Sequence, residues 1–284
     1  MNSTWRELLD SSAADLKEGG SENPRQEARW ILNHVATRAV SFPIETLEGP
    51  VTAQDQQRAA ILTRRRRSGE PLQIVLEQWD FHGHTFEVRR GVLVPRPETE
   101  SLVDLILTEN DSRPRTVLDL GCGSGVIGIS LKRARPSWTI FATDLDPEAL
   151  DLTGRNARAL GVSIELVRHD MTTPFARVRS MDLVVSNPPY IPSLELPTLP
   201  PEVTNYDPQL ALDGGADGLD GIRHVLDQAI QLLPSGGRVY FEMGSDQRKP
   251  ARILMRARGL HSIRCVQDLS GRDRIMVGIR GSIP

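Results

Sequence analysis

The chain has 284 residues, of which 39% are hydrophobic and 25% are charged, and its formal net charge is −3. This length suggests two domains and leaves one domain open, and the composition excludes disordered, collagen-like and low-complexity chains. The two cysteines, Cys122 and Cys265, form no C-x-x-C pattern. They fit a reducing compartment and exclude a thiolate zinc site, so we expect no metal.

The N-terminal sequence and the net charge limit the expected cellular location and the class of partner. The stretch from Met1 to Asp10 is charged and amphipathic and lacks the apolar core of a signal peptide. No apolar run approaches the roughly 18 residues that cross a membrane. We therefore expect a cytoplasmic protein. The net charge of −3 argues weakly against a dedicated nucleic-acid binder, because such proteins usually carry a basic excess.

One local basic run, Arg64–Arg67, stands out from this balance. It fits a solvated helix end that the helix dipole favours. Contact with RNA or with an acidic partner remains the alternative.

Residues 1–78 are predicted to form a small helical domain. Apolar residues recur there at helical spacing, as at Ala28, Ile31, Leu32, Val35 and Ala39. Another helix is expected over residues 52–67, closed by Gly69 and Pro71. Residues 79–94 alternate apolar and polar side chains around two glycines, which predicts a β-hairpin connector.

From Pro95 onward strands and helices alternate, which predicts an α/β domain over residues 95–284. The expected strands cover residues 116–120, 138–143, 163–168, 182–186, 237–242, 261–266 and 274–279. The expected helices cover residues 126–134, 147–161, 218–233 and 247–258. Repeated βα units predict a doubly wound, mostly parallel sheet, which binds ligands at the carboxyl ends of its strands.

A glycine-rich turn follows the first of these strands, in the stretch Asp119-Leu120-Gly121-Cys122-Gly123-Ser124-Gly125-Val126-Ile127-Gly128. Glycines let the backbone turn sharply and approach a ligand closely, and the N–H groups that begin the next helix suit an anionic or carboxylate group. The same letters satisfy the dinucleotide pattern G-x-G-x-x-G. Alternatively, the glycines serve only to pack the turn.

Acidic residues follow the next two expected strands. Asp144 stands where a carboxylate can accept both hydroxyl groups of an adenosine ribose. Asp170 could accept a hydrogen bond from an adenine amino group, while Met171 packs on the ring. A turn or cap aspartate is the alternative for each, although Asp146, followed by Pro147, already suits the cap of the next helix.

A third motif, Ser186-Asn187-Pro188-Pro189-Tyr190, decides between a nicotinamide cofactor and S-adenosylmethionine. The prolines fix the backbone and lack N–H donors, so their carbonyl groups are expected to project as acceptors. Asn187 adds one acceptor and two donors, and Tyr190 adds a flat stacking surface. Together they can hold a planar NH2 group by its hydrogens, which favours methyl transfer to nitrogen.

Two further groups of residues are weighed as candidates. His82 and His84 are expected to be surface residues, because two imidazoles in a hairpin lack further metal ligands. Arg96 and Glu98 precede the first sheet strand, near the expected mouth of the cofactor site, and are candidates for substrate contact. The competing interpretation is a helix start, since Pro97 suits a first turn.

Taken together, these residues resemble the HemK/PrmC-type protein-(glutamine-N5) methyltransferases over nearly the whole chain. The resemblance rests on Pro95–Glu100, Asp119–Gly125, Asn187–Ile191, Tyr206–Pro208, Ala211–Leu212, Gly214, Gly218–Leu219 and Asp268–Arg274. The Asn-Pro-Pro-Tyr letters alone also fit adenine-N6 and other amino-group methyltransferases. Their combination with Pro-Arg-Pro-Glu-Thr-Glu is much more specific.

The resemblance implies a class I S-adenosylmethionine-dependent fold, with a seven-stranded sheet whose last strand is antiparallel. It implies cofactor contacts from Gly121, Cys122, Gly123, Ser124, Gly125, Asp144, Met171 and Asn187, to which the position of Asp170 after its strand adds that residue. It implies that Asn187 and Pro188 hold the substrate amide while Pro189 and Tyr190 pack on it. The substrate would be the glutamine of a Gly-Gly-Gln loop in a peptide-chain release factor, gripped partly by the helical domain.

This sequence departs from the family in two places. The family commonly has an aromatic residue at the position of Met171, and residues 71–81 lack the usual glycine-containing pattern. Alternatives remain an adenine-N6 nucleic-acid methyltransferase, a glutamine-N5 methyltransferase of a ribosomal protein, and a non-catalytic module that binds S-adenosylmethionine. We expect a monomer without a direct nucleic-acid substrate.

Overall fold

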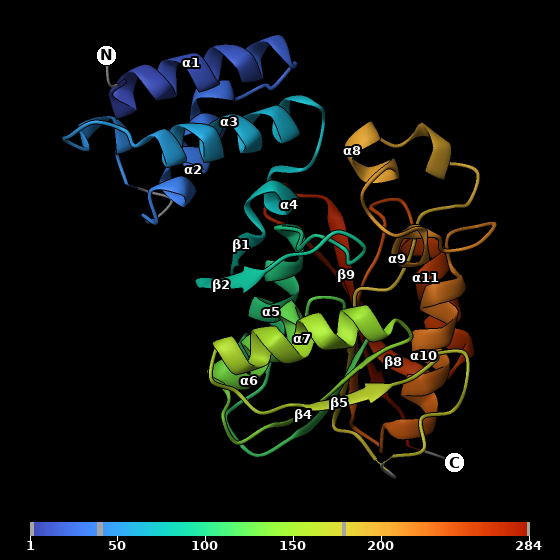
Figure 1. Ribbon diagram of the computed structural model, residues 1–284. Helices are drawn as coiled ribbons and strands as arrows, with labels where there is room; N and C mark the ends of the chain where they lie inside the picture. Colours follow the sequence, from blue (N-terminus) through green and yellow to red (C-terminus); the bar gives the residue numbers. More distant parts are fainter. Residues whose placement is uncertain (1–2, 39–41, 178–179, 283–284) are drawn as a thin grey trace. The chain divides into compact units, whose positions relative to one another are not determined.

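The computed structural model describes residues 3–38, 42–177 and 180–282 (Figure 1). By its internal contacts the chain forms two compact units. One is the chain up to Gln78 together with Pro201–Tyr206, and the other is Trp79–Pro200 together with the chain from Asp207 onward. Among the described residues, no helix has both the length and the apolar character that a bilayer crossing needs.

The first unit is helical. It contains α1 (Trp5–Glu18), α2 (Pro24–Val35), η1 (Ile44–Thr46), α3 (Ala53–Arg67), α4 (Leu72–Leu76) and α8 (Pro201–Thr204). Thr4 begins α1 with a capping box: its side chain accepts from the N–H of Glu7, and its own N–H donates to the Glu7 carboxylate. The apolar positions predicted from helical spacing are buried, namely Ala28, Ile31, Leu32 and Val35, whereas Ala39 lies outside the described residues.

Arg65, Arg66 and Arg67 of the basic run at the end of α3 form ion pairs within this unit. The pairs are Arg65–Glu70 at 2.7 Å, Arg66–Glu27 at 2.8 Å, Arg66–Glu202 at 3.3 Å and Arg67–Glu18 at 3.1 Å. These contacts favour a structural role for the run over contact with RNA. Glu202 lies in α8, a segment that the sequence assigned to the α/β domain because no local pattern marks its return to the helices.

Replacing Arg66 with alanine is expected to lower the free energy of unfolding by about 2 kcal/mol, because Glu27 would be left mostly buried without its partner. The two side chains are 15% and 13% exposed. Arg25→Ala is the matched control, since the Arg25–Asp10 pair joins side chains that are 55% and 57% exposed. Urea unfolding compares the two variants, and equal losses of stability would contradict the prediction.

The second unit is a seven-stranded sheet with helices on both faces. The strands are β3 (Thr116–Leu120), β4 (Thr139–Asp144), β5 (Glu165–Arg168), β6 (Leu183–Ser186), β7 (Arg238–Glu242), β8 (Leu260–Gln267) and β9 (Asp273–Arg280). The strand order is β5-β4-β3-β6-β7-β9-β8, and only β9 runs antiparallel to its neighbours. The predicted doubly wound sheet with an antiparallel last strand is therefore confirmed.

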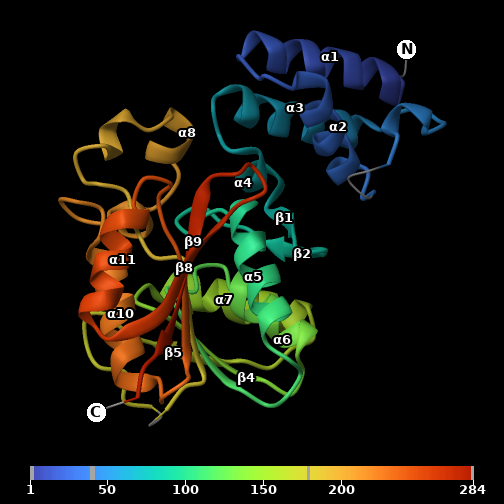
Figure 2. The same ribbon diagram turned by 180° about the vertical axis from the view of Figure 1, so that it is seen from behind.

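Helices cover the sheet on both sides (Figures 1 and 2). They are α5 (Glu98–Glu109), α6 (Val126–Ala134), α7 (Pro147–Ala159), α10 (Asp220–Leu232) and α11 (Arg248–Ala257), with short turns η2 (Leu196–Thr198) and α9 (Gln209–Leu212). Alternation along β3 builds two cores: Leu118 and Leu120 pack with α10 and α11, whereas Val117 packs with α5 and α6. The chain returns from β5 to β6, so the topological switch point lies between β3 and β6.

Most predicted elements agree with the structure to within two residues. Asp146 caps α7, as predicted, by accepting from the N–H of Glu148. The predicted hairpin is present as β1 (Gln78–Phe81) and β2 (His84–Glu87), but the chain after β2 is not a strand. Helix α5 was only weighed as a possible start at Pro97, and the short α4 and α9 were not predicted at all.

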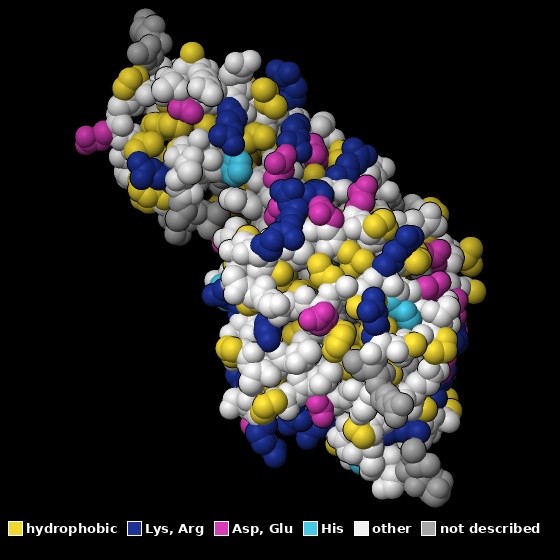
Figure 3. Space-filling view, turned by 60° about the horizontal axis from the view of Figure 1, so that its bottom comes forward, with side chains coloured by type: hydrophobic (Ala, Val, Ile, Leu, Met, Phe, Trp, Pro, Cys, Tyr) yellow, Lys and Arg dark blue, Asp and Glu magenta, His cyan; other side chains and the backbone are white. Residues whose placement is uncertain are grey.

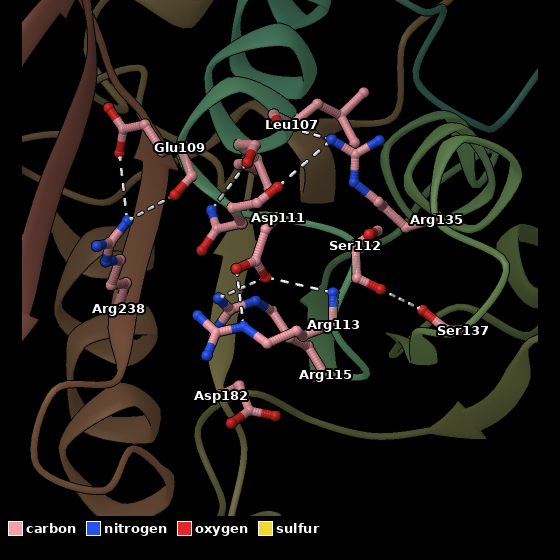
Figure 4. Close-up of polar contacts among 12 residues, drawn as sticks. Leu107, Glu109, Asp111, Ser112, Arg113, Arg115, Arg135, Ser137, Asp182 and Arg238 are labelled. Atoms are coloured by element: carbon pink, nitrogen blue, oxygen red, sulfur yellow. Dashed lines mark hydrogen bonds and ion pairs between the residues drawn. The ribbon is translucent and has the colours of Figure 1, made fainter.

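Polar contacts fix the loop between α5 and β3, at the end of the sheet where β3 begins (Figure 4). Asp111 pairs with Arg113 at 2.7 Å, and Arg135 donates to the carbonyl oxygen of Leu107 at 2.9 Å. Arg238 of β7 donates to the carbonyl oxygen of Glu109 at 3.2 Å. These contacts lie among the N-terminal ends of the strands, so this end of the unit has a structural role.

Candidate active site

A cavity of about 360 Å³ opens in the second unit where β3, β4, β5 and β6 end. Parallel sheets of this class bind ligands at this edge, beside the switch point. Several predicted site residues line it, namely Arg96, Gly121, Cys122, Gly123, Ser124, Asp144, Asp170, Met171, Asn187 and Pro189. Four others, Glu98, Gly125, Pro188 and Tyr190, are not among the lining residues.

Some glycines of the turn line the cavity, and others pack against neighbouring side chains. Gly121 and Gly123 line the cavity with φ of 69° and 55°, so the main chain itself faces the open space. Gly125 has φ of 84°, and a Cβ there would lie 2.7 Å from Cγ2 of Thr153. A Cβ on Gly128 would lie 2.9 Å from Oδ2 of Asp119. The packing interpretation therefore describes Gly125 and Gly128, whereas Gly121 and Gly123 lie on the cavity wall.

Gly125→Ala is expected to lower the free energy of unfolding by about 3 kcal/mol, because strain at positive φ adds to a clash with Thr153. Gly161→Ala is the control, since Gly161 has φ of 68° but nothing within 4 Å of its Cβ position. It should cost about 1 kcal/mol. Denaturant unfolding of both variants checks the difference, and a Gly125→Ala protein no less stable than the control would refute the packing role.

Two carboxyl groups lie beneath the turn. Asp144, at the end of β4, accepts from the N–H of Gly123 at 2.9 Å and from the N–H of Asp146 at 3.0 Å. Its burial raises its pKa. Asp119 lies on β3, fully buried, and accepts from the N–H of Gly128 at 2.9 Å; burial raises its pKa to about 7. Asp144 lines the cavity and Asp119 does not, which separates a carboxylate on the cavity wall from one that fixes the turn.

Asp170 and Met171 follow β5 on the cavity wall. Asp170 accepts from the N–H of Thr172 at 2.9 Å, and this bond lowers the pKa of the carboxyl group. Met171 packs against the core on the α10 side, and its Cε lies 3.4 Å from where a Cβ on Gly121 would stand. The thioether thus forms an apolar surface beside the glycine turn.

The Asn-Pro-Pro-Tyr motif follows β6 and faces in several directions. Asn187 lines the cavity, and its Nδ2 donates to Oγ1 of Thr99 at 3.2 Å. Pro188 is buried, and the carbonyl oxygen of Pro189 lies 2.5 Å from where a Cβ on Gly221 would stand. The carbonyl oxygen of Tyr190 accepts from Nε2 of Gln247 at 2.8 Å, and burial raises the pKa of the Tyr190 hydroxyl to about 12.

Arg96 and Glu98 differ in their placement. Arg96 lines the cavity and pairs with the buried carboxylate of Asp207 at 2.5 Å. Asp207 also accepts from the N–H of Val94, so it joins the Arg96 loop to the Tyr-Asp-Pro stretch. Glu98 is the first residue of α5 and stands outside the lining set. His82 and His84 bind Asp104 and Arg133, and among the described residues no group of three or more ligating side chains could hold a metal.

Two buried residues linked to Asn187 by hydrogen bonds, Thr99 and Glu242, are not predicted from the sequence, and Thr99 also lines the cavity. Thr99 lies in the first turn of α5 and donates to Oε2 of Glu242 at 2.7 Å. Glu242 ends β7 and is 1% exposed. Its signal was an acidic residue directly after an apolar strand, the same pattern that singled out Asp144. Thr99 lies in the Pro-Arg-Pro-Glu-Thr-Glu motif, but its partner Glu242 is too distant in the chain for a local pattern to indicate the contact.

Comparison with known proteins agrees with the fold of both units. A model described as the PrmC N-terminal domain matches residues 7–76, and one described as the methyltransferase small domain matches residues 98–197. Two solved structures share the fold: a methyltransferase from Pyrococcus furiosus (TM-score 0.53, 17% identity, 79% of this chain and 98% of that one) and a T. thermophilus 16S rRNA N2 G1207 methyltransferase (TM-score 0.52, 15% identity, 72% and 49%).

Relatives with curated names match along almost their whole length. The release factor glutamine methyltransferase of Moorella thermoacetica is 37% identical over 98% of this chain and 99% of its own. Proteins of the same name from Geobacter sulfurreducens and Caulobacter vibrioides are 34% and 37% identical, over 97% and 94% of this chain and 96% and 93% of theirs. With this identity over both units and the motifs gathered at one cavity, the chain belongs to the release factor glutamine methyltransferase family.

Proposed function

We propose that this chain transfers a methyl group from S-adenosylmethionine to the side-chain amide nitrogen, N5, of the glutamine in the Gly-Gly-Gln motif of a peptide-chain release factor. The observation that carries the proposal is the place of Asn187, whose amide lines the same cavity as the glycine turn and Asp144. The name shared by the relatives supports the substrate.

The cavity fits the methyl donor in the chemistry of its walls. Gly121 and Gly123 put main chain rather than side chains against the ligand, and Asp144 presents carboxylate oxygens suited to ribose hydroxyls. Asp170 is suited to accept from an adenine amino group, and Met171 offers an apolar surface for the ring. Cys122 and Ser124 complete the turn. When bound, S-adenosylmethionine supplies an electrophilic methyl group on a positively charged sulfur.

The chain's own residues would hold and orient the substrate amide. An amide nitrogen is a poor nucleophile because its lone pair is delocalised, so acceptors on its hydrogens raise its electron density and fix its direction. We assign these acceptors to Asn187 Oδ1 and the Pro188 carbonyl group. Pro189 and Tyr190 would pack on the amide plane, and the raised pKa of Tyr190 keeps its hydroxyl protonated.

The remaining assignments concern recognition and setting. We propose that residues 1–78 help to bind the release factor and that residues 95–284 form the catalytic domain. Residues 79–94 would form the connector between these two domains. Arg96 and Glu98 would contact the substrate near the cavity. The enzyme would act as a monomer in the cytoplasm, where translation takes place.

The test is mass spectrometry of an intact release factor incubated with the protein and S-adenosylmethionine. The expected result is a gain of one methyl group on the glutamine of Gly-Gly-Gln, absent when that glutamine is replaced by glutamate. Binding of S-adenosylmethionine without any label on the release factor would reject this substrate. If no turnover occurs at saturating concentrations of S-adenosylmethionine and release factor, the result would instead support a non-catalytic binding module.

The same experiment includes the alternative substrates. An adenine-N6 enzyme must extrude its base and needs a basic surface to hold nucleic acid. On the face shown in Figure 3, Lys and Arg side chains are interspersed with acidic and hydrophobic ones, which does not favour that alternative. A panel of DNA, RNA and ribosomal proteins, incubated in parallel with the release factor, should remain unlabelled.

A further inference from the structure

Three residues from separate elements of the second unit form a hydrogen-bonded relay that leads from the cavity wall, at Asn187 and Thr99, to the buried Glu242. Asn187 follows β6, Thr99 lies in the first turn of α5, and Glu242 ends β7. Asn187 Nδ2 donates to Thr99 Oγ1 at 3.2 Å, and Thr99 Oγ1 donates to Glu242 Oε2 at 2.7 Å. Thr99 is 2% and Glu242 is 1% exposed, so the bond between these two side chains is shielded from water.

We propose that Thr99 and Glu242 are positioning residues that fix the direction of the Asn187 amide, so that Oδ1 rather than Nδ2 is presented to the substrate. The inference rests on the proposed role of Asn187 and adds the device that orients it. Among the described residues, none donates a hydrogen bond to Asn187 Oδ1. That oxygen is therefore available as the acceptor that an amide substrate needs.

The direction of the relay follows from the charge of Glu242. An ionised carboxylate only accepts hydrogen bonds, so Thr99 must donate its single proton to it. The lone pairs of Thr99 are then left to accept, and they bind the NH2 end of Asn187. If Glu242 becomes protonated, it can donate to Thr99, whose own proton can then turn toward the oxygen end of Asn187. Protonation thus removes the preference for the productive orientation.

The surroundings place this change near neutral pH. Burial raises the pKa of Glu242 to about 7, opposed by the Thr99 hydrogen bond and by the charge of Arg274, and reinforced by the charge of Glu98. A contact with the Tyr190 hydroxyl also opposes the rise. Arg274 of β9 is itself paired with Asp268 at 3.3 Å. Since the active form is the ionised one, turnover should fall as pH drops through about 7.

The buried carboxylate of Glu242 lowers the stability of the folded protein if its role is only to fill space. A buried charge is destabilising unless it is well paired, and well-packed neutral residues often replace such groups without loss of stability. The negative charge of Glu98 adds to this cost, since it also raises the pKa of Glu242. A role in orienting Asn187 explains why an ionisable group occupies this position.

The experiment combines three variants with a matched control. Thr99→Val removes the hydroxyl and should lower kcat about tenfold with little change in the KM for S-adenosylmethionine, because it misorients a positioned group. Thr99→Ser should restore most of kcat. Thr63→Val is the control, since Thr63 is 3% exposed and its hydroxyl has no hydrogen-bond partner among the described residues. Glu242→Gln should abolish the fall in kcat near pH 7.

A second readout needs no substrate. The side-chain amide signals of Asn187 in a nitrogen-15 NMR spectrum, identified by their loss in Asn187→Ala, should titrate near pH 7 in the unaltered protein but not in Glu242→Gln. A titration that persists in Glu242→Gln would overturn the relay, as would a Thr99→Val variant with the kcat of the control. If the amide titrates as expected while no release factor is methylated, the relay stands and the proposed function fails.

Discussion

Asn187→Ala is expected to lower kcat by about 10²–10³-fold, while the dissociation constant for S-adenosylmethionine changes far less. The range is that of removing one preorganised polar group from a developing charge. Asn187 supplies an acceptor for the substrate amide, and alanine leaves the Thr99 hydroxyl facing the gap. Steady-state kinetics with an intact release factor, together with calorimetric titration of the methyl donor, measure the two effects separately.

The control for this variant uses an asparagine of the same unit that the cavity does not include. Asn156 is 1% exposed and binds the main chain of Glu87 and Ser124. Asn156→Ala should therefore lower the unfolding midpoint more than Asn187→Ala does. Near-normal turnover of Asn187→Ala in a folded protein would show that another group holds the amide.

Asp144→Ala is expected to raise the apparent dissociation constant of S-adenosylmethionine about 100-fold, because two hydrogen bonds from ribose hydroxyls to a charged acceptor are lost at roughly 1.5 kcal/mol each. The change also releases the N–H of Gly123, which Asp144 binds at 2.9 Å. Asp144→Asn keeps one acceptor oxygen. Its dissociation constant for S-adenosylmethionine should therefore lie between those of the unaltered protein and of Asp144→Ala. Asp151→Ala is the control, since Asp151 is exposed and pairs only with Arg89 among the ion pairs of the described chain. Unchanged donor binding by Asp144→Ala would remove the ribose assignment.

Local patterns were sufficient to predict the sheet and the edge where ligands bind. A run such as Thr116–Leu120 is apolar and bounded by turn residues, and the glycine turn and Asp144 follow their strands directly in the chain. Parallel strands bring their carboxyl ends to one edge of the sheet. Residues that directly follow different strands in the sequence are therefore predicted to lie near one another. The gathering of these residues at one cavity follows from the same logic.

Residues whose partners come from distant elements could not be predicted in this way. Thr99 and Glu242 are 143 positions apart, and only the packing of α5 on β7 brings them together. Pro188 and Tyr190 are not among the residues that line the cavity, and the Gln247 side chain that binds the carbonyl oxygen of Tyr190 lies 57 positions later in the chain. The short helices α4 and α9 span too few residues to show a period.

The first unit has a consequence for the order in which the protein is made. Arg66 binds Glu27 early in the chain, but its other partner, Glu202, follows 136 residues later. A ribosome therefore releases β3, β4, β5 and β6 of the central sheet before the segment that completes the helical unit emerges. Most of this unit is synthesised well before the segment that completes it. In a nascent chain stopped before residue 201, Arg66 would pair with Glu27 but not with Glu202. Limited proteolysis of stalled chains would follow that late closure as a gain in resistance.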